Sequence, residues 1–302
     1  MRHGKYPFII GFLVVPVALY AVFVVWAYIQ AFYLSVYEWS GLGPLTHFVG
    51  FDNFTKLWHD ELFWRSLGHN AYVLVLLPIV TIILALVFAF LLNVGGGHRG
   101  GVTRGVWGSK FYRIIFFFPQ LLALAIVAVI FGRVFGPDKS GMINGLLPDS
   151  WTPWLFLADE RWAMTCLLFV LIWQAVGFYV VLFSAGMGNI SPEVYEAAAL
   201  DGATRSTLFF KITIPLLWNT IQVAWVYLGI AAFDCFALVN IMTVDRGGPD
   251  GATSVLSLMI YRNAFEFSQA GYASALGVVL FFLTLTFAAL TLRVTRRESV
   301  EA

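Results

Sequence analysis

The chain has 302 residues, of which 60% are apolar and only 12% are charged, about half the charged share of a soluble domain. Aromatic residues make up 17% of the chain and include 11 Trp, a composition typical of proteins whose rings gather at membrane interfaces. A formal net charge of +1 gives no sign of a nucleic-acid partner. These values exclude an ordinary soluble domain and indicate an integral membrane protein.

Six segments are long and apolar enough to cross a membrane as helices, which requires roughly 20 mostly apolar residues. In chain order they are residues 8–36, 71–92, 114–135, 164–186, 216–242 and 271–292. The first is too long for the core of a signal peptide, so we expect it to remain as a span. The sequence therefore predicts an all-α integral membrane protein with six transmembrane helices, and residues 1–302 as a single transmembrane domain.

The basic residues predict the orientation, because Lys and Arg near the ends of spans stay on the cytoplasmic side. Both termini and the loops after the second and fourth spans carry most of them: Arg2, Lys5, Arg99, Arg104, Lys110, Arg113, Arg205, Lys211, Arg293, Arg296 and Arg297. The other three loops carry Lys56, Arg65, Arg133, Lys139, Arg161, Arg246 and Arg262. We therefore expect both termini in the cytoplasm.

The sequence offers little for catalysis or for metal binding. It contains no paired carboxylates, no Ser, His and Asp set and no metal-spaced histidines at one location; His59 and His69 are expected to be surface histidines. The glycine-rich stretch 93–101 predicts a flexible cytoplasmic turn, and residues 105–110 lack the order of a Walker phosphate loop. We expect no catalytic residue, no metal and no cofactor bound by this chain. Cys166 and Cys235 lie inside predicted spans and are expected to be buried packing residues.

The cytoplasmic loop 187–215, between the fourth and fifth spans, predicts a helix, a glycine elbow and a second short helix. Ser191 is suited to cap the first helix, and Pro192 fits its first position, where no backbone donor is needed. Gly202 can take the left-handed conformation just past the helix end, and Thr204 can cap a helix towards Phe210. Such a loop is too short and polar to cross the membrane, and its alanine face suits a groove on a partner.

This loop resembles the EAA loop of permease subunits in binding-protein-dependent ABC importers. Glu196-Ala197-Ala198 is followed at the family spacing by Gly202, Ile212 and Pro215, and Ile214 replaces the usual leucine. Residues 191–204 are similar to the carbohydrate-uptake branch, of the maltose and glycerol-phosphate type. Residues 48–54 and 243–275 resemble further segments of sugar permeases. In that family the loop docks on a cytoplasmic ATPase, so the resemblance implies coupling residues here: Glu196, Ala197, Ala198, Asp201 and Gly202.

Four polar or aromatic residues inside the predicted spans are candidates for the substrate path: Asp234, Asn240, Gln174 and Trp173. Carboxylate and amide groups suit sugar hydroxyls, and an aromatic ring suits an apolar sugar face. An intramembrane charge is costly and usually faces a cavity or a partner, which puts Asp234 first. The alternative is structural, with Gln174 and Asn240 bonded to a neighbouring helix backbone, Asp234 paired with a basic residue or second subunit, and Trp173 a packing ring.

The leading hypothesis is a multi-pass permease subunit in a bacterial-type inner membrane that forms half of the path of an ATP-driven sugar importer. The resemblance implies a second permease subunit, two ATP-binding subunits that use ATP and Mg, an extracytoplasmic solute-binding protein and a sugar, with membrane lipid around the spans and no nucleic acid. The alternative is an ion-coupled secondary transporter of a small polar solute, for which only Asp234 offers a coupling group. A membrane scaffold without transport leaves the pattern of loop 187–215 unexplained.

Overall fold

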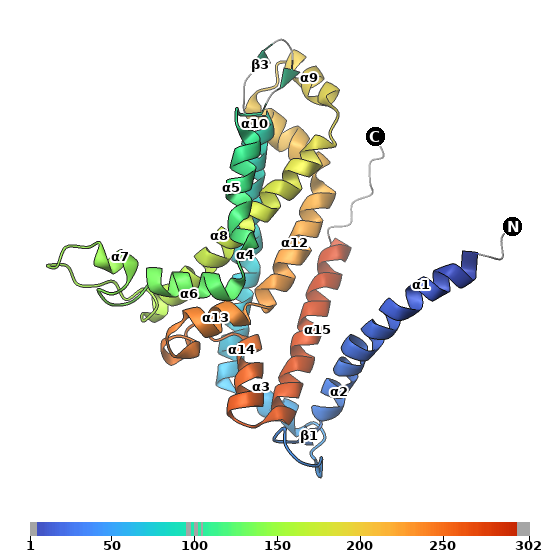
Figure 1. Cartoon of the computed structure of the whole chain (residues 1–302), viewed down its shortest axis with the longest axis vertical. Helices are drawn as coiled ribbons and strands as arrows, with labels where there is room; N and C mark the ends of the chain where they lie inside the picture. The colour runs from blue at the N-terminus through green and yellow to red at the C-terminus, as the bar shows by residue number, and fades with distance from the viewer. Residues whose placement is uncertain (1–4, 95–97, 100–101, 104, 295–302) are drawn as a thin grey trace. The chain divides into compact units, whose positions relative to one another are not determined.

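The computed structural model describes residues 5–94, 98–99, 102–103 and 105–294. In these ranges the regular structure is helical except for two antiparallel hairpins with two residues per strand (Figure 1). The chain divides into two compact units, one of Met1–Trp64 with Leu256–Leu283 and the other of Arg65–Val255 with Thr284–Ala302. Helices α4 (Glu61–Val94) and α15 (Ala270–Val294) each contribute to both units.

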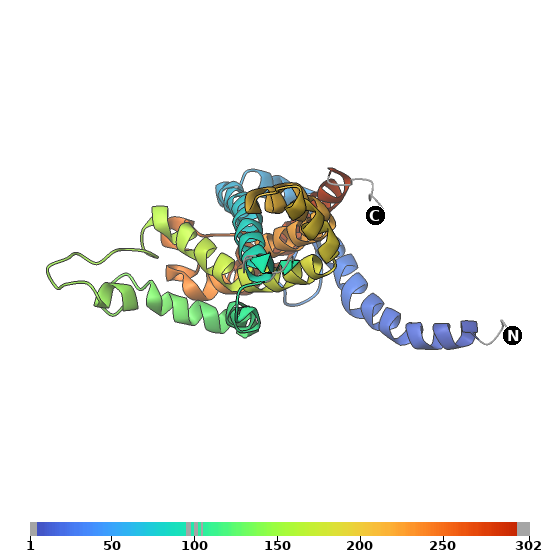
Figure 2. The ribbon, with the colours of Figure 1, turned by 90° about the horizontal axis from the view of Figure 1, so that it is seen from above.

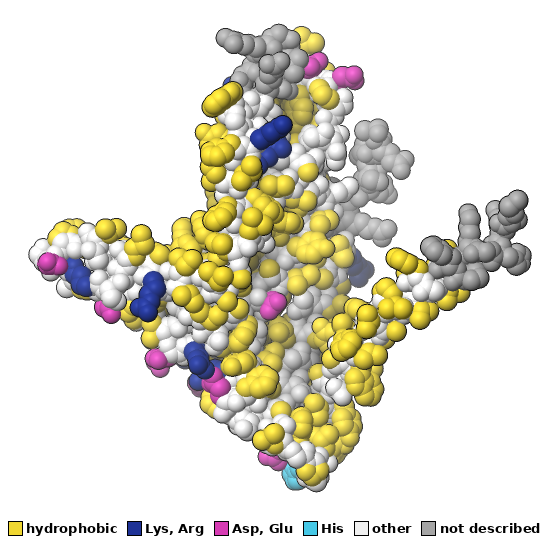
Figure 3. Space-filling view, in the orientation of Figure 1, with side chains coloured by type: hydrophobic (Ala, Val, Ile, Leu, Met, Phe, Trp, Pro, Cys, Tyr) yellow, Lys and Arg dark blue, Asp and Glu magenta, His cyan; other side chains and the backbone are white. Residues whose placement is uncertain are grey.

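The first unit begins with an apolar rod of α1, the π-helix η1 and α2, which run on as one curved helix in Figures 1 and 2. Their bounds are Lys5–Tyr20, Ala21–Val25 and Trp26–Leu34. No residue in the most apolar stretch of the rod is buried, and Figure 3 shows hydrophobic side chains along it. Near its end, the rings of Tyr28 and Phe32 contact Phe281 of α15. An apolar helix of this length that is exposed over most of its surface fits a hydrocarbon environment.

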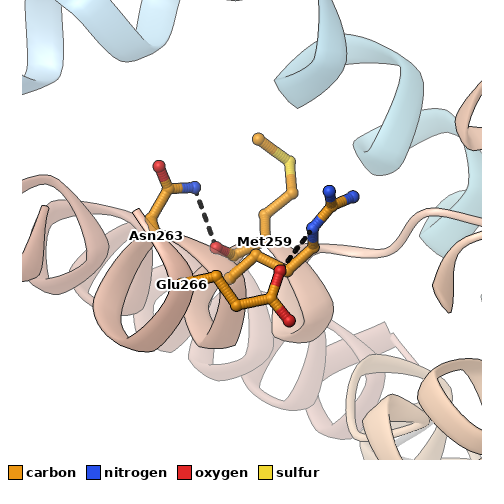
Figure 4. A network of polar contacts seen from close by, with 4 residues as sticks. Met259, Asn263 and Glu266 are labelled. Atoms are coloured by element: carbon orange, nitrogen blue, oxygen red, sulfur yellow. Dashed lines mark hydrogen bonds and ion pairs between the residues drawn. The ribbon is translucent and has the colours of Figure 1, made fainter. Parts of the chain in front are cut away.

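The rest of the first unit gathers around the end of α2. Strand β1 (Tyr37–Glu38) pairs with β2 (His47–Phe48), with Tyr37 opposite Phe48, and α3 (Asp52–Trp58) and the start of α4 follow. Helix α14 (Leu256–Tyr261) continues into the π-helix η5 (Arg262–Glu266), which leads to α15. Figure 4 shows the contacts that hold this turn: Asn263 Nδ2 donates to the Met259 carbonyl at 2.9 Å, and Arg262 pairs with Glu266 at 3.2 Å.

The second unit is built around α8 (Glu160–Gly188), which packs against α5 (Ser109–Leu121). Phe183 and Leu167 are among the side chains of α8 that are completely buried. A second contact pairs α6 (Leu124–Val134) with α13 (Phe236–Met242). The remaining elements are β3 (His98–Arg99), β4 (Val102–Thr103), α7 (Met142–Gly145), α9 (Pro192–Leu200), α10 (Arg205–Thr207), the π-helix η2 (Leu208–Thr213), α11 (Ile214–Leu216), α12 (Trp218–Phe233) and the 3-10 turns η3 (Val244–Arg246) and η4 (Pro249–Gly251).

Four helical stretches are each long and apolar enough to span a membrane: Ile9–Leu34, Glu61–Val94, Glu160–Gly188 and Ala270–Arg293. They correspond to the predicted spans 8–36, 71–92, 164–186 and 271–292. Two bent pairs bring the total to as many as six if each pair is one span. The described residues therefore hold four to six candidate spans, and the count of six stays a prediction.

The third and fifth predicted spans are not straight helices. In place of one helix over 114–135, α5 and α6 meet at 94°, because Leu122 and Ala123 are both extended with ψ of 134°. In place of one helix over 216–242, α12 starts after a 72° bend from the preceding helical segment. A second break at Asp234 and Cys235 separates α12 from α13. Apolar length alone does not predict such breaks, because a segment has the same length and composition whether its helix is straight or bent.

The two cysteines are buried, as the sequence predicts. The histidines differ from each other. His59 is exposed, with Nδ1 2.8 Å from the Thr55 carbonyl. His69 is half-buried in α4, and its Nδ1 lies 2.8 Å from the Ser254 carbonyl. The prediction of a surface histidine is wrong for His69, which ties α4 to the loop before α14.

Candidate functional site

The coupling loop, residues 187–215, begins where α8 ends and carries the nine-residue helix α9. Pro192 occupies the first turn of α9, as predicted, and Ser191 takes the N-cap position. The predicted hydrogen bond from the Ser191 side chain is wrong: the hydroxyl caps nothing, and the Ser191 carbonyl accepts the Val194 amide at 3.1 Å. A side-chain cap accepts an amide from the second or third helical position. The amide of Val194, at the third position, is already bonded to the Ser191 carbonyl.

The end of α9 follows the predicted glycine stop. Gly202 has a φ of +79°, and its amide donates to the Ala199 carbonyl at 3.1 Å. The Ala203 amide donates to the Ala198 carbonyl at 2.9 Å, which completes the paired pattern of a Schellman motif. The Thr204 hydroxyl then accepts the Thr207 amide at 3.3 Å, so Thr204 caps the second helix as predicted.

A buried tyrosine that was not among the predicted site residues anchors α9 to η2. The Tyr195 side chain is only 4% exposed, and its hydroxyl lies 3.2 Å from Thr213 Oγ1. Thr213 in turn donates to the Leu208 carbonyl at 3.0 Å across η2. Burial raises the pKa of the Tyr195 phenol above its ordinary value, because the phenolate loses hydration. The phenol therefore stays neutral and links α9 to the helix that follows the elbow.

None of the five predicted coupling residues is buried. Ala197, Asp201 and Gly202 are exposed, and Glu196 and Ala198 are half-buried. Leu200, which the prediction did not include, is 89% exposed. The coupling loop thus exposes small residues, acidic groups and a few large apolar side chains, of which Leu200 is the most exposed, a mixture that favours docking on a protein surface over contact with lipid.

A polar node joins α4, α5 and α8 just before the coupling loop begins. Asn93 Nδ2 donates to Ser184 Oγ at 3.0 Å and to the Ala89 carbonyl at 2.6 Å. Arg113 Nη2 donates to Asn93 Oδ1 at 2.6 Å. The prediction that Asn93 lies in a flexible turn is wrong, because α4 continues to Val94. Of the predicted turn 93–101, residues 95–97 and 100–101 lie outside the described residues, and His98–Arg99 forms β3.

The predicted path residues on α8 make contacts with the bend between α5 and α6. Gln174 Nε2 donates to the Leu122 carbonyl at 3.1 Å, and Leu122 is one of the two residues at which the bend occurs. The Trp173 ring packs edge-on against Phe131, with 4.9 Å between centroids. These are the structural roles that the sequence left open as alternatives for both residues.

The predicted path residues near the second break differ in their surroundings. Asp234 is exposed at the C-terminal cap of α12, and its amide donates to the Ala231 carbonyl at 3.1 Å. Asn240 lies on α13, and its Oδ1 is buried without a hydrogen-bond partner among the described residues. A buried acceptor without a donor is costly, so this amide has capacity for a further bond.

Comparison with known proteins gives the family. The chain is 41% identical over 300 residues to the diacetylchitobiose uptake system permease protein NgcF of Streptomyces coelicolor, and the alignment covers 98% of this chain and 84% of that protein. It is 33% identical to the probable ABC transporter permease protein YurN of Bacillus subtilis, over 90% of this chain and 91% of that one. It is 30% identical to the multiple sugar-binding transport system permease protein MsmF of Streptococcus mutans, over 96% and 95%. The chain belongs to the sugar permeases of ABC transporters.

The fold of this permease is shared with a solved transporter. A chain in the crystal structure of a bacterial ABC transporter involved in the import of the acidic polysaccharide alginate superposes with a TM-score of 0.80, covering 98% of this permease and 97% of that chain at 22% identity. No protein-family model matches the sequence. Family membership and the apolar helices make the permease a multi-pass membrane protein, and the ion-coupled secondary transporter is left without support.

Two segments that resemble sugar permeases in sequence meet in the first unit of this permease. Asn53 is buried, and its amide donates to the Ser35 carbonyl at 2.8 Å and to the Tyr37 carbonyl at 3.0 Å. Gly271 donates to the Trp39 carbonyl at 3.0 Å. A Cβ at Gly271 would collide with the Tyr37 carbonyl oxygen, so glycine is required there by close approach. The two motifs therefore fix the backbone around β1.

Proposed function

We propose that this permease forms half of the translocation path of an ATP-driven sugar importer. The observation that carries the proposal is the coupling loop: a short helix with a glycine stop, anchored by Tyr195 and outwardly exposed, directly after a candidate span. Residues 1–302 act as one permease domain, and the energy comes from ATP and Mg bound by two separate ATPase subunits. A second permease subunit supplies the other half of the path, and an extracytoplasmic solute-binding protein delivers the sugar.

The relatives support a saccharide as the substrate. One is named for diacetylchitobiose uptake and another for multiple sugars. We take diacetylchitobiose as the first substrate to test, because the relative named for it is 41% identical over 98% of this chain. The chain itself has no catalytic role in the proposal, binds no metal or cofactor of its own and has no nucleic-acid partner.

The coupling loop has a mechanical role in this proposal, with both termini and the loop in the cytoplasm. Glu196, Ala197, Ala198, Asp201 and Gly202 contact the ATPase, and closure of the ATPase pair moves α9. Tyr195 passes that motion to η2 through Thr213, and α8 passes it to the node at Asn93 and Arg113. Packed helices switch between discrete arrangements and do not deform continuously, so the cavity alternates between outward and inward access. Asp234 and Asn240 stay candidates for the path itself.

Crosslinking from the coupling loop tests this proposal. Ala197→Cys, in a Cys166→Ala and Cys235→Ala background, places a thiol on an exposed position of α9, whereas Ala198 is half-buried. In native membranes that contain the whole transporter, we expect a crosslink to an ATPase subunit whose yield changes when nucleotide is added. Leu146→Cys is the matched control, because position 146 is 81% exposed and lies outside the coupling loop. It should give no such adduct.

Transport measurements complete the test. Uptake of labelled diacetylchitobiose should stop when the cognate ATPase is deleted, and a secondary transporter would continue to accumulate it. If a folded, membrane-inserted Ala197→Cys chain gives no ATPase adduct and uptake survives the deletion, the importer proposal is wrong.

A further inference from the structure

A cleft lined by both polar and aromatic residues lies within the first unit, at the end of α2. Its volume is about 540 Å³, within the range of ligand sites in proteins. The lining comes from segments far apart in the sequence, residues 38–56 and 268–272. The path residues predicted from the sequence are elsewhere in the chain, so the cleft is a separate candidate for ligand binding.

The aromatic part of the lining consists of Trp39 and Tyr272. Trp39 is half-buried, with its ring nitrogen bonded to the Gly43 carbonyl at 3.1 Å. Tyr272 is also held, because its hydroxyl donates to Asp60 at 2.7 Å. The Tyr272 side chain is only 4% exposed, so it forms part of the wall, and Trp39 is the aromatic residue with an accessible ring. A ring held in place can offer its apolar face at little entropic cost, which is the property that stacking on a sugar ring requires.

The polar part of the lining carries more negative than positive charge. Asp52 and Glu38 contribute carboxylates, and Lys56 contributes the ammonium group. Lys56 Nζ donates to Gln269 Oε1 at 2.9 Å and lies 4.8 Å from the centre of the Tyr272 ring. Glu38 is 3.0 Å from His47 on the exposed rim. Carboxylate oxygens accept hydrogen bonds from hydroxyl groups and repel anions, so the lining favours a neutral, hydroxyl-rich ligand.

Hydrogen bonds and close packing fix the backbone around the cleft before any ligand binds. The buried amide of Asn53 bonds both the Ser35 and Tyr37 carbonyls, and Gly271 approaches Tyr37 closely enough to exclude a side chain. These contacts hold strand β1, directly after which Trp39 lies. A preformed wall reduces the ordering cost of binding.

Backbone strain lies in the same lining. Ser268 borders the cleft with a φ of +51°, in the left-handed region that residues other than glycine rarely occupy. Its neighbours hold it there, because the Gln269 amide donates to the Asn263 carbonyl at 2.7 Å and the Phe267 amide to the Arg262 carbonyl at 2.9 Å. Strain that surrounding contacts maintain is concentrated at ligand sites.

From these observations we infer that the cleft is a binding subsite for a neutral saccharide, with a sugar ring on Trp39 and hydroxyl groups on Asp52 and Gln269. The inference rests on the proposed sugar transport for the class of ligand. It adds a location outside the predicted path residues and a preference for neutral over acidic sugars.

Equilibrium binding to the complete transporter without its binding protein tests the inference. The assembly, in lipid nanodiscs, is titrated with labelled diacetylchitobiose and separately with digalacturonic acid, an acidic disaccharide. We expect saturable binding of the neutral sugar and weaker binding of the acidic one. Trp39→Ala should weaken neutral binding by about tenfold or more, which corresponds to about 1.4 kcal/mol, and Trp39→Phe should restore most of it. Asp52→Asn should narrow the difference between the two sugars.

The matched control is Trp58→Ala, which removes another tryptophan of the same unit, 63% exposed and outside the cleft lining, and it should leave binding unchanged. Equal affinity for the acidic sugar overturns the charge preference. Saccharide binding that is absent in the wild type, or unaffected by Trp39→Ala in a folded assembly, overturns the subsite. The subsite is also overturned if Trp39→Ala abolishes docking of the binding protein and leaves the saccharide affinity unchanged. That result would assign the cleft to contact with a protein. ATP-dependent uptake that persists in any of these cases leaves the proposed function intact, so the two failures are distinguishable.

Discussion

The chain interrupts its helices in two different ways. The elbow after α9 is closed by its own neighbours, since Gly202 and Ala203 donate to the carbonyls of Ala199 and Ala198. At the bend between α5 and α6, the Leu122 amide donates locally to the Pro119 carbonyl at 3.2 Å, but the Leu122 carbonyl receives its hydrogen bond from Gln174 on α8. The elbow is therefore a self-contained joint that can move as a unit. The bend is braced by a neighbouring helix, and its geometry depends on tertiary packing.

The largest effect is expected from removing the brace. Gln174→Leu replaces the amide with an apolar side chain of similar volume and leaves the Leu122 carbonyl without its donor. We expect a cost of about 2 kcal/mol, because no water is present within the membrane to bond the unpaired acceptor. Thermal unfolding of the detergent-solubilised permease measures the loss. Gln174→Glu, which cannot donate as a carboxylate, should be at least as damaging.

The same substitution sharpens the assignment of Gln174. A purely structural brace predicts that transport falls in proportion to the amount of folded protein, with the KM for sugar unchanged. A raised KM in the folded fraction would contradict this and return Gln174 to the substrate path.

The next largest effect is expected at the self-contained joint. Gly202→Val places a β-branched residue at a φ of +79°, which costs about 1–2 kcal/mol for an L residue in the left-handed region. Nothing lies within 4 Å of a Cβ at this position, so the cost is one of backbone conformation and not of collision. We expect the α9 stop to fray and crosslinking from Ala197→Cys to the ATPase to fall.

Gly202→Asn is the control for that measurement, because asparagine tolerates the left-handed conformation. It should retain most of the crosslinking. If crosslinking falls equally in both variants, the partner requires that position 202 carry no side chain. The conformational explanation would then be wrong.

The smallest effect is expected from Tyr195→Phe, which keeps the buried ring and removes the hydroxyl that meets Thr213. The stability cost should be about 1 kcal/mol, the usual net value of one hydrogen bond. If Tyr195 links α9 to η2 mechanically, ATPase activity should persist while sugar uptake per ATP falls. An unchanged ratio of uptake to hydrolysis would limit Tyr195 to packing.

The residues whose roles could be predicted from the sequence are those that act through local contacts. Pro192, Gly202 and Thr204 act through neighbours a few residues away, and the structure places each as predicted. Ser191 fails as a side-chain cap because a backbone bond takes its place. Tyr195 could have been noticed as a large aromatic residue in a mostly polar and small-residue helix. Its partner Thr213 lies beyond the elbow, and no sequence pattern predicts that contact.

Composition and apolar length determined that this chain is a helical membrane protein, and the spacing from Glu196 to Pro215 determined the family resemblance that the relatives bear out. Composition and apolar length are properties of a whole segment, and the motif residues act through near neighbours in the chain. Both kinds of feature can therefore be recognised in the sequence alone. Only the tertiary structure decided where the third and fifth predicted spans break, that Asn93 meets Arg113, and that residues 38–56 and 268–272 line one cleft. Each of these depends on hydrogen bonds and packing between segments distant in sequence, and such pairings leave no periodic mark on either segment alone.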